Sequence, residues 1–219
     1  GSKQLTCVQY SSSRPGLVGM MLDGPDLVAR VASRLCHDLI SPIGAIGNGV
    51  ELLALAGNGG AETELIDQSV KLAAARLRLY RIAFGSSTGD QHIPPSEIQA
   101  ILHGFSPNQR ISCHWHCPEG CLRTDAKRVL LGILCLETAM SHGGQVNVTH
   151  TPEGWVLHAE ASRLRNLSDQ WVHLASSRVD MLILSPPSEI QFALLAVTLI
   201  EANLTIVTEV SETTIDLRF

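Results

Sequence analysis

The sequence is poor in aromatic and charged side chains. Aromatic residues make up 4% of its 219 residues and charged residues 17%, where an average soluble protein has about a quarter charged. The apolar fraction of 45% is therefore mostly aliphatic, and it suffices to bury the core of one large domain or two small ones. The net charge of −5 disfavours nucleic acid and anionic membrane as partners, and we expect neither.

Long apolar runs are also missing. The longest candidate, residues 192–200, is far shorter than the roughly 18 residues of a membrane span. Residues 1–20 lack the basic start and apolar stretch of a signal peptide, and we expect them to form a disordered tail that begins with a cloning remnant, Gly1-Ser2. The expected location is therefore the cytoplasm, where the six cysteines would be free thiols.

Two amphipathic segments are predicted within residues 21–88. The first begins at Leu27 and ends before the glycine cluster 57–60, and the second ends before 85–87. Their apolar stripes are Val28, Val31, Leu35, Leu39, Pro42, Ile46, Val50 and Leu53, then Ile66, Val70, Ala73, Leu77, Tyr80 and Phe84. This pattern predicts an antiparallel helical hairpin. Two helices cover each other on one side only, so we expect a homodimer in which a second copy completes a four-helix bundle.

Residues 91–219 alternate between helical and strand patterns, after a boundary near 86–91. Helices are expected at about 95–105, 127–141, 168–175 and 189–202, and strands at 110–117, 145–150, 155–160, 204–210 and 213–219. The predicted fold class is α+β, with helices on one face of a mostly antiparallel sheet.

A histidine lies opposite the first apolar stripe, in the string CHDLISP at residues 36–42. At about 100° per residue His37 falls about 180° from the stripe, so we expect an exposed imidazole. The residues expected beside it are Arg30, Ser33, Arg34, Ser41, Gly44 and Asn48. A neutral imidazole is a nucleophile, Asp38 could assist it, and the two arginines could hold phosphoryl oxygens.

Three glycines, Gly44, Gly47 and Gly49, follow within the same predicted helix. Each lowers helix stability by up to about 1 kcal/mol. Their presence predicts that a partner surface or a neighbouring helix approaches closely there.

The string 36–42 resembles the H-box of two-component histidine kinases. Over residues 22–219 the chain is similar to the ChpT-type histidine phosphotransferases of alphaproteobacterial phosphorelays. The similarity lies in RLCHDLISP at 34–42, RIAFG at 81–85 and the turn Gly143-Gly144.

This resemblance implies a relay. His37 would take a phosphoryl group from the receiver domain of a hybrid kinase and pass it to aspartates of response regulators. Asp38 would assist, and Ser41, Arg34 and the hairpin face would meet the receiver, which supplies Mg²⁺. The second domain would resemble a degenerate histidine-kinase ATPase domain that binds no ATP.

The residues of the second domain lead independently to the same expectation about ATP. An ATP-binding kinase domain needs an Asn on its long helix and glycine-rich turns for phosphate. The segment 127–141 contains no Asn, and no glycine follows Gly154. We therefore expect no cofactor and no autokinase activity. Two alternatives remain open: an active sensor-kinase core, and a non-enzymatic dimeric scaffold or zinc-stabilised adaptor.

The zinc alternative rests on CHWHCPEGC at residues 113–121. Its C-x3-C-x3-C spacing matches no common zinc pattern. On a strand Cys113, Trp115 and Cys117 face one way while His114 and His116 face the other. We therefore expect a buried Cys/Trp face and an exposed His face, with no metal site.

Overall fold

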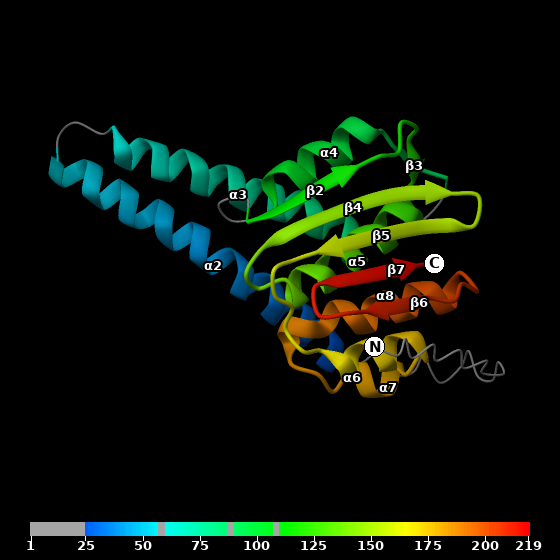
Figure 1. Ribbon diagram of the computed structural model, residues 1–219. Helices are drawn as coiled ribbons and strands as arrows, with labels where there is room; N and C mark the ends of the chain where they lie inside the picture. The colour runs from blue at the N-terminus through cyan, green and yellow to red at the C-terminus, as the bar shows by residue number, and fades with distance from the viewer. Residues whose placement is uncertain (1–24, 57–59, 87–89, 107–109) are drawn as a thin grey trace.

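A computed structural model describes residues 25–56, 60–86, 90–106 and 110–219. The tail expected at 1–20 and most of the glycine cluster after the first helix lie outside the described residues. The predicted hairpin consists of α2 (Pro25–Ala56) and α3 (Ala61–Ala83), which project together from the rest of the molecule (Figure 1). In the described part of the chain, no helix is both long and apolar enough to cross a membrane.

The two hairpin helices pack closely through small residues. Pro42 and Gly49 on α2 and Ser69 on α3 are buried. A Cβ atom on Gly49 would lie 2.6 Å from Cγ1 of Ile66, so at this position the neighbouring helix requires a glycine. A Cβ on Gly44 would meet no described atom within 4 Å, so packing among the described residues does not explain that glycine.

The expected apolar stripes are only partly correct. The helical period predicts Val28, Val50, Val70 and Leu77 in the seam between the helices, but each is about half exposed or more. The predicted stripes include residues that do not lie between the helices, because each hairpin helix carries apolar residues on two faces. One face packs within the hairpin, and the other is exposed among the residues that the structure describes.

The C-terminal region contains a five-stranded sheet. Its strand order is β2-β4-β5-β7-β6, with β2 parallel to β4 and the other pairs antiparallel. The strands are β2 (Ile111–Trp115), β4 (Gly144–Thr151), β5 (Gly154–Glu160), β6 (Val207–Val210) and β7 (Thr214–Arg218). Gly143, at φ 92°, makes the turn into β4, where a Cβ would collide with the Arg110 carbonyl oxygen 2.5 Å away.

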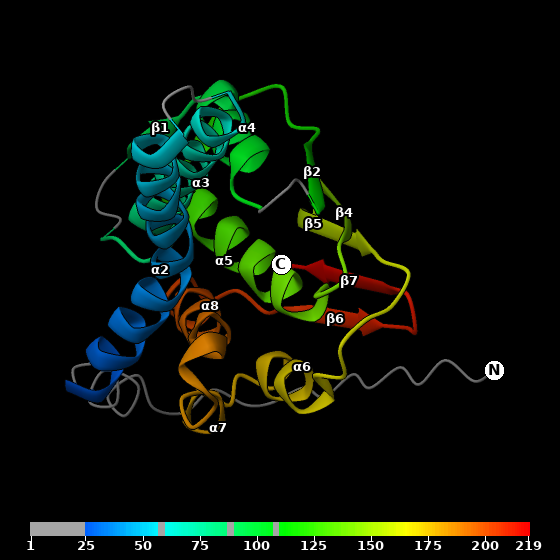
Figure 2. The same ribbon diagram turned by 90° about the vertical axis from the view of Figure 1, so that its left-hand side faces the viewer.

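The helices α4 (Pro95–Gly104), α5 (Arg123–Ala139) and α8 (Ile190–Glu201) lie between the sheet and the hairpin (Figure 2). Alternate sheet residues such as Val146 and Leu157 are fully buried. This one-sided covering confirms the predicted α+β class, because the two central strands β4 and β5 bury every second residue along most of their length, as a half-covered sheet requires.

Several short elements were not predicted. They are the two-stranded ribbon of β1 (His92–Ile93) with β3 (Cys121–Leu122), the short helix α7 (Val179–Leu182), and the 3-10 turn η2 (Pro187–Glu189) just before α8. The helix α6 (Ser168–Ala175) lies at the predicted residues. Elements of two to four residues are too short to show a period. The long helix also begins at Arg123 rather than Lys127, so Thr124 and Asp125 lie in its first turn.

The end of α3 is attached to α5 through backbone carbonyls. Arg123 Nη2 donates to the Arg81 carbonyl at 3.2 Å, and Lys127 Nζ donates to the Gly85 carbonyl at 2.9 Å. Cations at a helix C-terminus donate hydrogen bonds to its free carbonyls and interact favourably with the negative end of its dipole. The sequence RIAFG at 81–85 is therefore where the hairpin joins the C-terminal region.

Candidate functional site

His37 projects into solvent from the middle of α2. Its side chain is 78% exposed, as the helical arrangement predicted. Ser33, Ser41, Gly44 and Asn48 are exposed as well. The expected polar face around the histidine is therefore present, and it is made of small side chains.

Asp38 lies beside the imidazole, and most of its carboxyl group is buried. Its Oδ1 is 3.0 Å from Nδ1 of His37. Its Oδ2 accepts from the hydroxyl of Tyr80 and from Nη1 of Arg76 at 3.4 Å, and it forms an ion pair with Nε of Arg34 at 2.9 Å. One oxygen thus serves the histidine while the other is fixed by groups beneath it.

These surroundings keep Asp38 ionised. Burial by itself raises the pKa of the carboxyl group, but the Arg34 guanidinium, the hydrogen bonds from His37 and Tyr80, and the Arg76 charge together hold the pKa below its ordinary value. An ionised carboxylate only accepts hydrogen bonds, so the hydrogen between it and His37 belongs to Nδ1. In the neutral imidazole, Nε2 then carries the free lone pair.

The two arginines do not lie where the helical projection put them. Arg34 was expected on the exposed face around His37, but its side chain is only 9% exposed. Its Nη1 donates to the Ser188 carbonyl at 2.6 Å, and Arg30 Nη1 donates to the Ser185 carbonyl at 2.7 Å. The helical period reflects only neighbours along α2, whereas the 185–188 segment, distant in sequence, covers this side of the helix.

Sequence reasoning missed three residues of this site. Arg76 and Tyr80 come from α3 and Glu137 comes from α5. The helical period predicts Tyr80 only as an apolar seam residue. The sequence does hold one hint, an arginine embedded in the apolar stretch LAAARL at 72–77, but it gives no sign of a partner 61 residues away.

A family model describing the histidine phosphotransferase C-terminal domain matches residues 95–214. This chain belongs to the histidine phosphotransferase family. The protein phosphotransferase ChpT of Brucella abortus (strain 2308) is 37% identical over 130 residues, which are 58% of this chain and 62% of that relative, so the match covers less than two thirds of its length. The resemblance inferred from the sequence is thus confirmed.

The similarity extends to a solved structure. A bacterial phosphotransferase aligns with a TM-score of 0.69 and 28% identity, covering 90% of this chain and 96% of that one. The Acinetobacter baumannii histidine kinase AdeS aligns at 11% identity and a TM-score of 0.39 over 84% of this chain and 96% of that chain.

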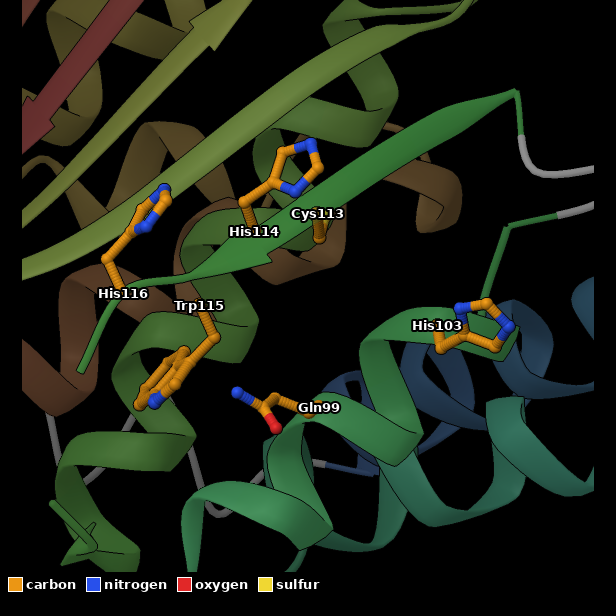
Figure 3. A pocket seen from close by; sticks show the side chains of 6 residues that line it. All are labelled: Gln99, His103, Cys113, His114, Trp115 and His116. Carbon is orange, nitrogen blue, oxygen red and sulfur yellow. The ribbon is translucent and has the colours of Figure 1, made fainter. Parts of the chain in front are cut away.

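The side chains of the cysteine–histidine stretch at residues 113–121 do not converge on one point. Cys113 and Trp115 project toward the helices, while His114 and His116 project from the opposite side of β2 (Figure 3). His116 Nε2 is 2.9 Å from Oδ1 of Asn147, on the neighbouring strand. Within the described residues, no three His, Cys, Asp or Glu side chains gather closely enough to hold a metal ion.

Proposed function

We propose that this protein relays a phosphoryl group between an aspartate of a receiver domain and His37. The observation that carries the proposal is the pairing of His37 with Asp38, in which Nδ1 is held at 3.0 Å and the rest of the ring is exposed. A partner can therefore reach Nε2 without any rearrangement of this chain. Phosphoryl transfer needs little more from the acceptor than a positioned nucleophile.

The chemistry follows from the tautomer. Nε2 attacks phosphorus, the new N–P bond forms, and the P–O bond to the receiver aspartate breaks to release its carboxylate. The imidazole gains positive charge as it is phosphorylated, and the Asp38 carboxylate stabilises that charge through Nδ1–H. The reverse steps pass the group to the aspartate of a response regulator.

The docking surface proposed for the receiver is the small polar face of α2, made of Ser33, Ser41, Gly44 and Asn48. A receiver must bring its aspartyl phosphate within about 3 Å of Nε2, and small side chains permit that approach. Arg34 has a different task in this proposal: its guanidinium pairs with Asp38 and so does not hold phosphoryl oxygens. We propose that the Mg²⁺ required for transfer is bound by the carboxylates of the receiver.

We further propose that the C-terminal region does not use ATP. A kinase ATPase domain would offer phosphate a glycine turn before its last helix, whereas α8 begins after the Pro-Pro-Ser-Glu sequence at 186–189. The Glu189 carboxylate is almost fully buried there, paired with Arg165 at 2.8 Å and Gln170 at 2.7 Å. A buried carboxylate at a helix N-terminus occupies the place where a phosphate would bind, and its negative charge repels a second anion there.

The uncovered apolar face of the hairpin supports the expected homodimer. Ile40, Ile43 and Val50 follow one another on α2 at spacings of three and seven, and each is more than half exposed. Val70 and Leu77 continue the apolar surface on α3, at 47% and 54% exposure. Such a stripe suits a helical partner with the same pattern, which a second copy provides.

Phosphoryl transfer from a labelled receiver tests this function. Wild type, His37→Ala and His142→Ala are each incubated with a phosphorylated receiver domain and Mg²⁺. His142 is an exposed histidine in the turn after α5, and it serves as the matched control. Wild type and His142→Ala should acquire acid-labile phosphate while His37→Ala acquires none. Equal loss of phosphate from the receiver with all three proteins would refute the proposal.

A second experiment distinguishes a phosphorelay protein from a sensor kinase. The purified protein is incubated with γ-labelled ATP and Mg²⁺ in the absence of a receiver. The proposal expects no phosphohistidine on this chain. Labelling of His37 from ATP would favour a sensor-kinase core.

A further inference from the structure

Asp38, the carboxylate that orients His37, shares two arginines with a second carboxylate, Glu137. Arg76 Nη1 lies 3.4 Å from Asp38 Oδ2 and 3.2 Å from Glu137 Oε2, and its Nη2 also donates to Glu137. Arg34 pairs with Asp38 at 2.9 Å and approaches Glu137 at 3.8 Å. The chain of contacts runs from the imidazole to α5 of the C-terminal region.

Charge and burial both favour one fixed arrangement of this network. Two guanidinium and two carboxylate groups balance to zero, and their side chains are 7–14% exposed. A buried charge left without its partner is strongly destabilising, so each ion of the network requires the others. Tyr80 adds a neutral donor to Asp38 and accepts from Arg76 Nη1 at 3.1 Å.

Glu137 is the member that keeps Arg76 in place. The guanidinium offers two nitrogens to Glu137 and uses one of them to reach Asp38 as well. The fork geometry of arginine fixes the direction of both contacts at once. The guanidinium of Arg76 also lies over the Phe105 ring, whose centroid is 5.7 Å from Cζ.

We propose that Glu137 is a positioning residue for phosphoryl transfer at His37. It acts from the C-terminal region through Arg76 and Arg34, which hold Asp38 in the orientation that keeps the hydrogen on Nδ1 and leaves Nε2 free. This inference rests on the proposed function of His37. It assigns the C-terminal region a chemical task in the transfer that requires no nucleotide.

A double-mutant cycle between Asp38 and Glu137 tests the inference. Glu137→Gln, Asp38→Asn and the double variant are compared with wild type for the rate of transfer from a phosphorylated receiver. Glu137→Gln should slow transfer about tenfold, a size typical of coupling within one ion-pair network. In the Asp38→Asn background the same change should have no further effect. Full additivity of the two rate effects would overturn the inference.

Two further measurements separate positioning from a purely structural role. Nitrogen-15 spectra of the His37 ring should show a smaller share of the Nδ1–H tautomer in Glu137→Gln, and Glu137→Asp, which keeps the charge, should recover part of the rate. Asp125→Asn removes another α5 carboxylate that pairs with an arginine, Arg128, and should leave transfer and tautomer unchanged. Glu137→Gln with a wild-type tautomer ratio would contradict the proposal.

The outcome also remains distinct from a failure of the proposed function. If His37→Ala still accepts phosphate, the proposed function itself is wrong. If His37 is required but Glu137 and Asp38 act independently, only this inference fails. Should Glu137→Gln not fold, Arg76→Lys provides the second variant, because it keeps the charge and loses the fork, and it should slow transfer to a similar extent.

Discussion

Nδ1 of His37 lies 3.0 Å from Oδ1 of Asp38, its neighbour along α2. We expect Asp38→Asn to lower the rate of phosphoryl transfer by about 10²-fold, because the amide no longer stabilises positive charge on the ring. It should also lower the free energy of unfolding by about 3 kcal/mol, since two buried arginines lose a partner. Rapid-quench measurements with a phosphorylated receiver and urea unfolding separate the two effects. An unchanged transfer rate would contradict the role of the carboxylate.

The lowered pKa of Asp38 predicts how stability depends on acid. In the unfolded chain its carboxyl group titrates near its ordinary value of about 3.9, while in the folded protein the arginines hold the pKa lower. Its contribution is therefore fully present above about pH 5 and is lost as the pH falls through the folded pKa. Urea unfolding of wild type and Asp38→Asn should show a stability difference that is constant from pH 7 to 5 and shrinks below pH 4. A difference that grows on acidification would contradict this sign.

The sequence predicted those parts of the molecule that repeat along one helix or strand. His37 opposite the seam, the hairpin and the α+β order all follow from periods of 3.6 and 2 residues. Cys113 and Trp115 facing inward and His114 and His116 facing outward follow from the same rule. Such patterns depend only on neighbours within one element.

The network under His37 could not be predicted in this way, because its members come from three helices. Arg34 has the helical position of an exposed residue, and only the docking of the 185–188 segment buries it. Glu137 lies on the largely buried helix α5, and only its ion pair with Arg76 explains a carboxylate there. Contacts between distant segments leave no period in a sequence.

The thiols of the C-terminal region should be unreactive in the folded protein. Burial, followed by the Glu137 charge, raises the pKa of Cys113 to about 12, and burial with the Asp125 charge raises that of Cys121 to about 11. Thiolate is the reactive form, so iodoacetamide at pH 7.5 should leave both unmodified. Mass spectrometry of tryptic peptides before and after unfolding in urea checks this, with the unfolded sample as the positive control. Rapid modification of Cys113, which is only half-buried, would be inconsistent with its raised pKa.

Two glycines of α2 should respond to alanine in opposite ways. Gly44→Ala should raise the free energy of unfolding by about 1 kcal/mol, because a Cβ there has no neighbour within 4 Å among the described residues and alanine favours the helix. Gly49→Ala should lower it by about 1 kcal/mol or more, since the added carbon would lie 2.6 Å from Ile66 Cγ1 and force the helices apart. Urea unfolding of the two variants under identical conditions provides the comparison. Stabilisation by both would mean that the hairpin is packed less closely at Gly49.

The apolar face of the hairpin predicts how the dimer can be broken. Ile43→Asp with Val50→Asp places two carboxylates on residues that are 59% and 53% exposed in one chain. If a second copy covers them, each buried charge lacks a partner and the dissociation constant should rise by at least about 100-fold. Sedimentation velocity should then show twice the mass of one chain for wild type and a single-chain mass for the double variant. Asn48→Asp, an exposed position on the His37 face of the same helix, controls for added charge and should remain dimeric. Persistence of the dimer in the double variant would mean that the interface lies elsewhere. A single-chain mass for wild type would contradict the homodimer and would mean that the apolar face binds a different helical partner.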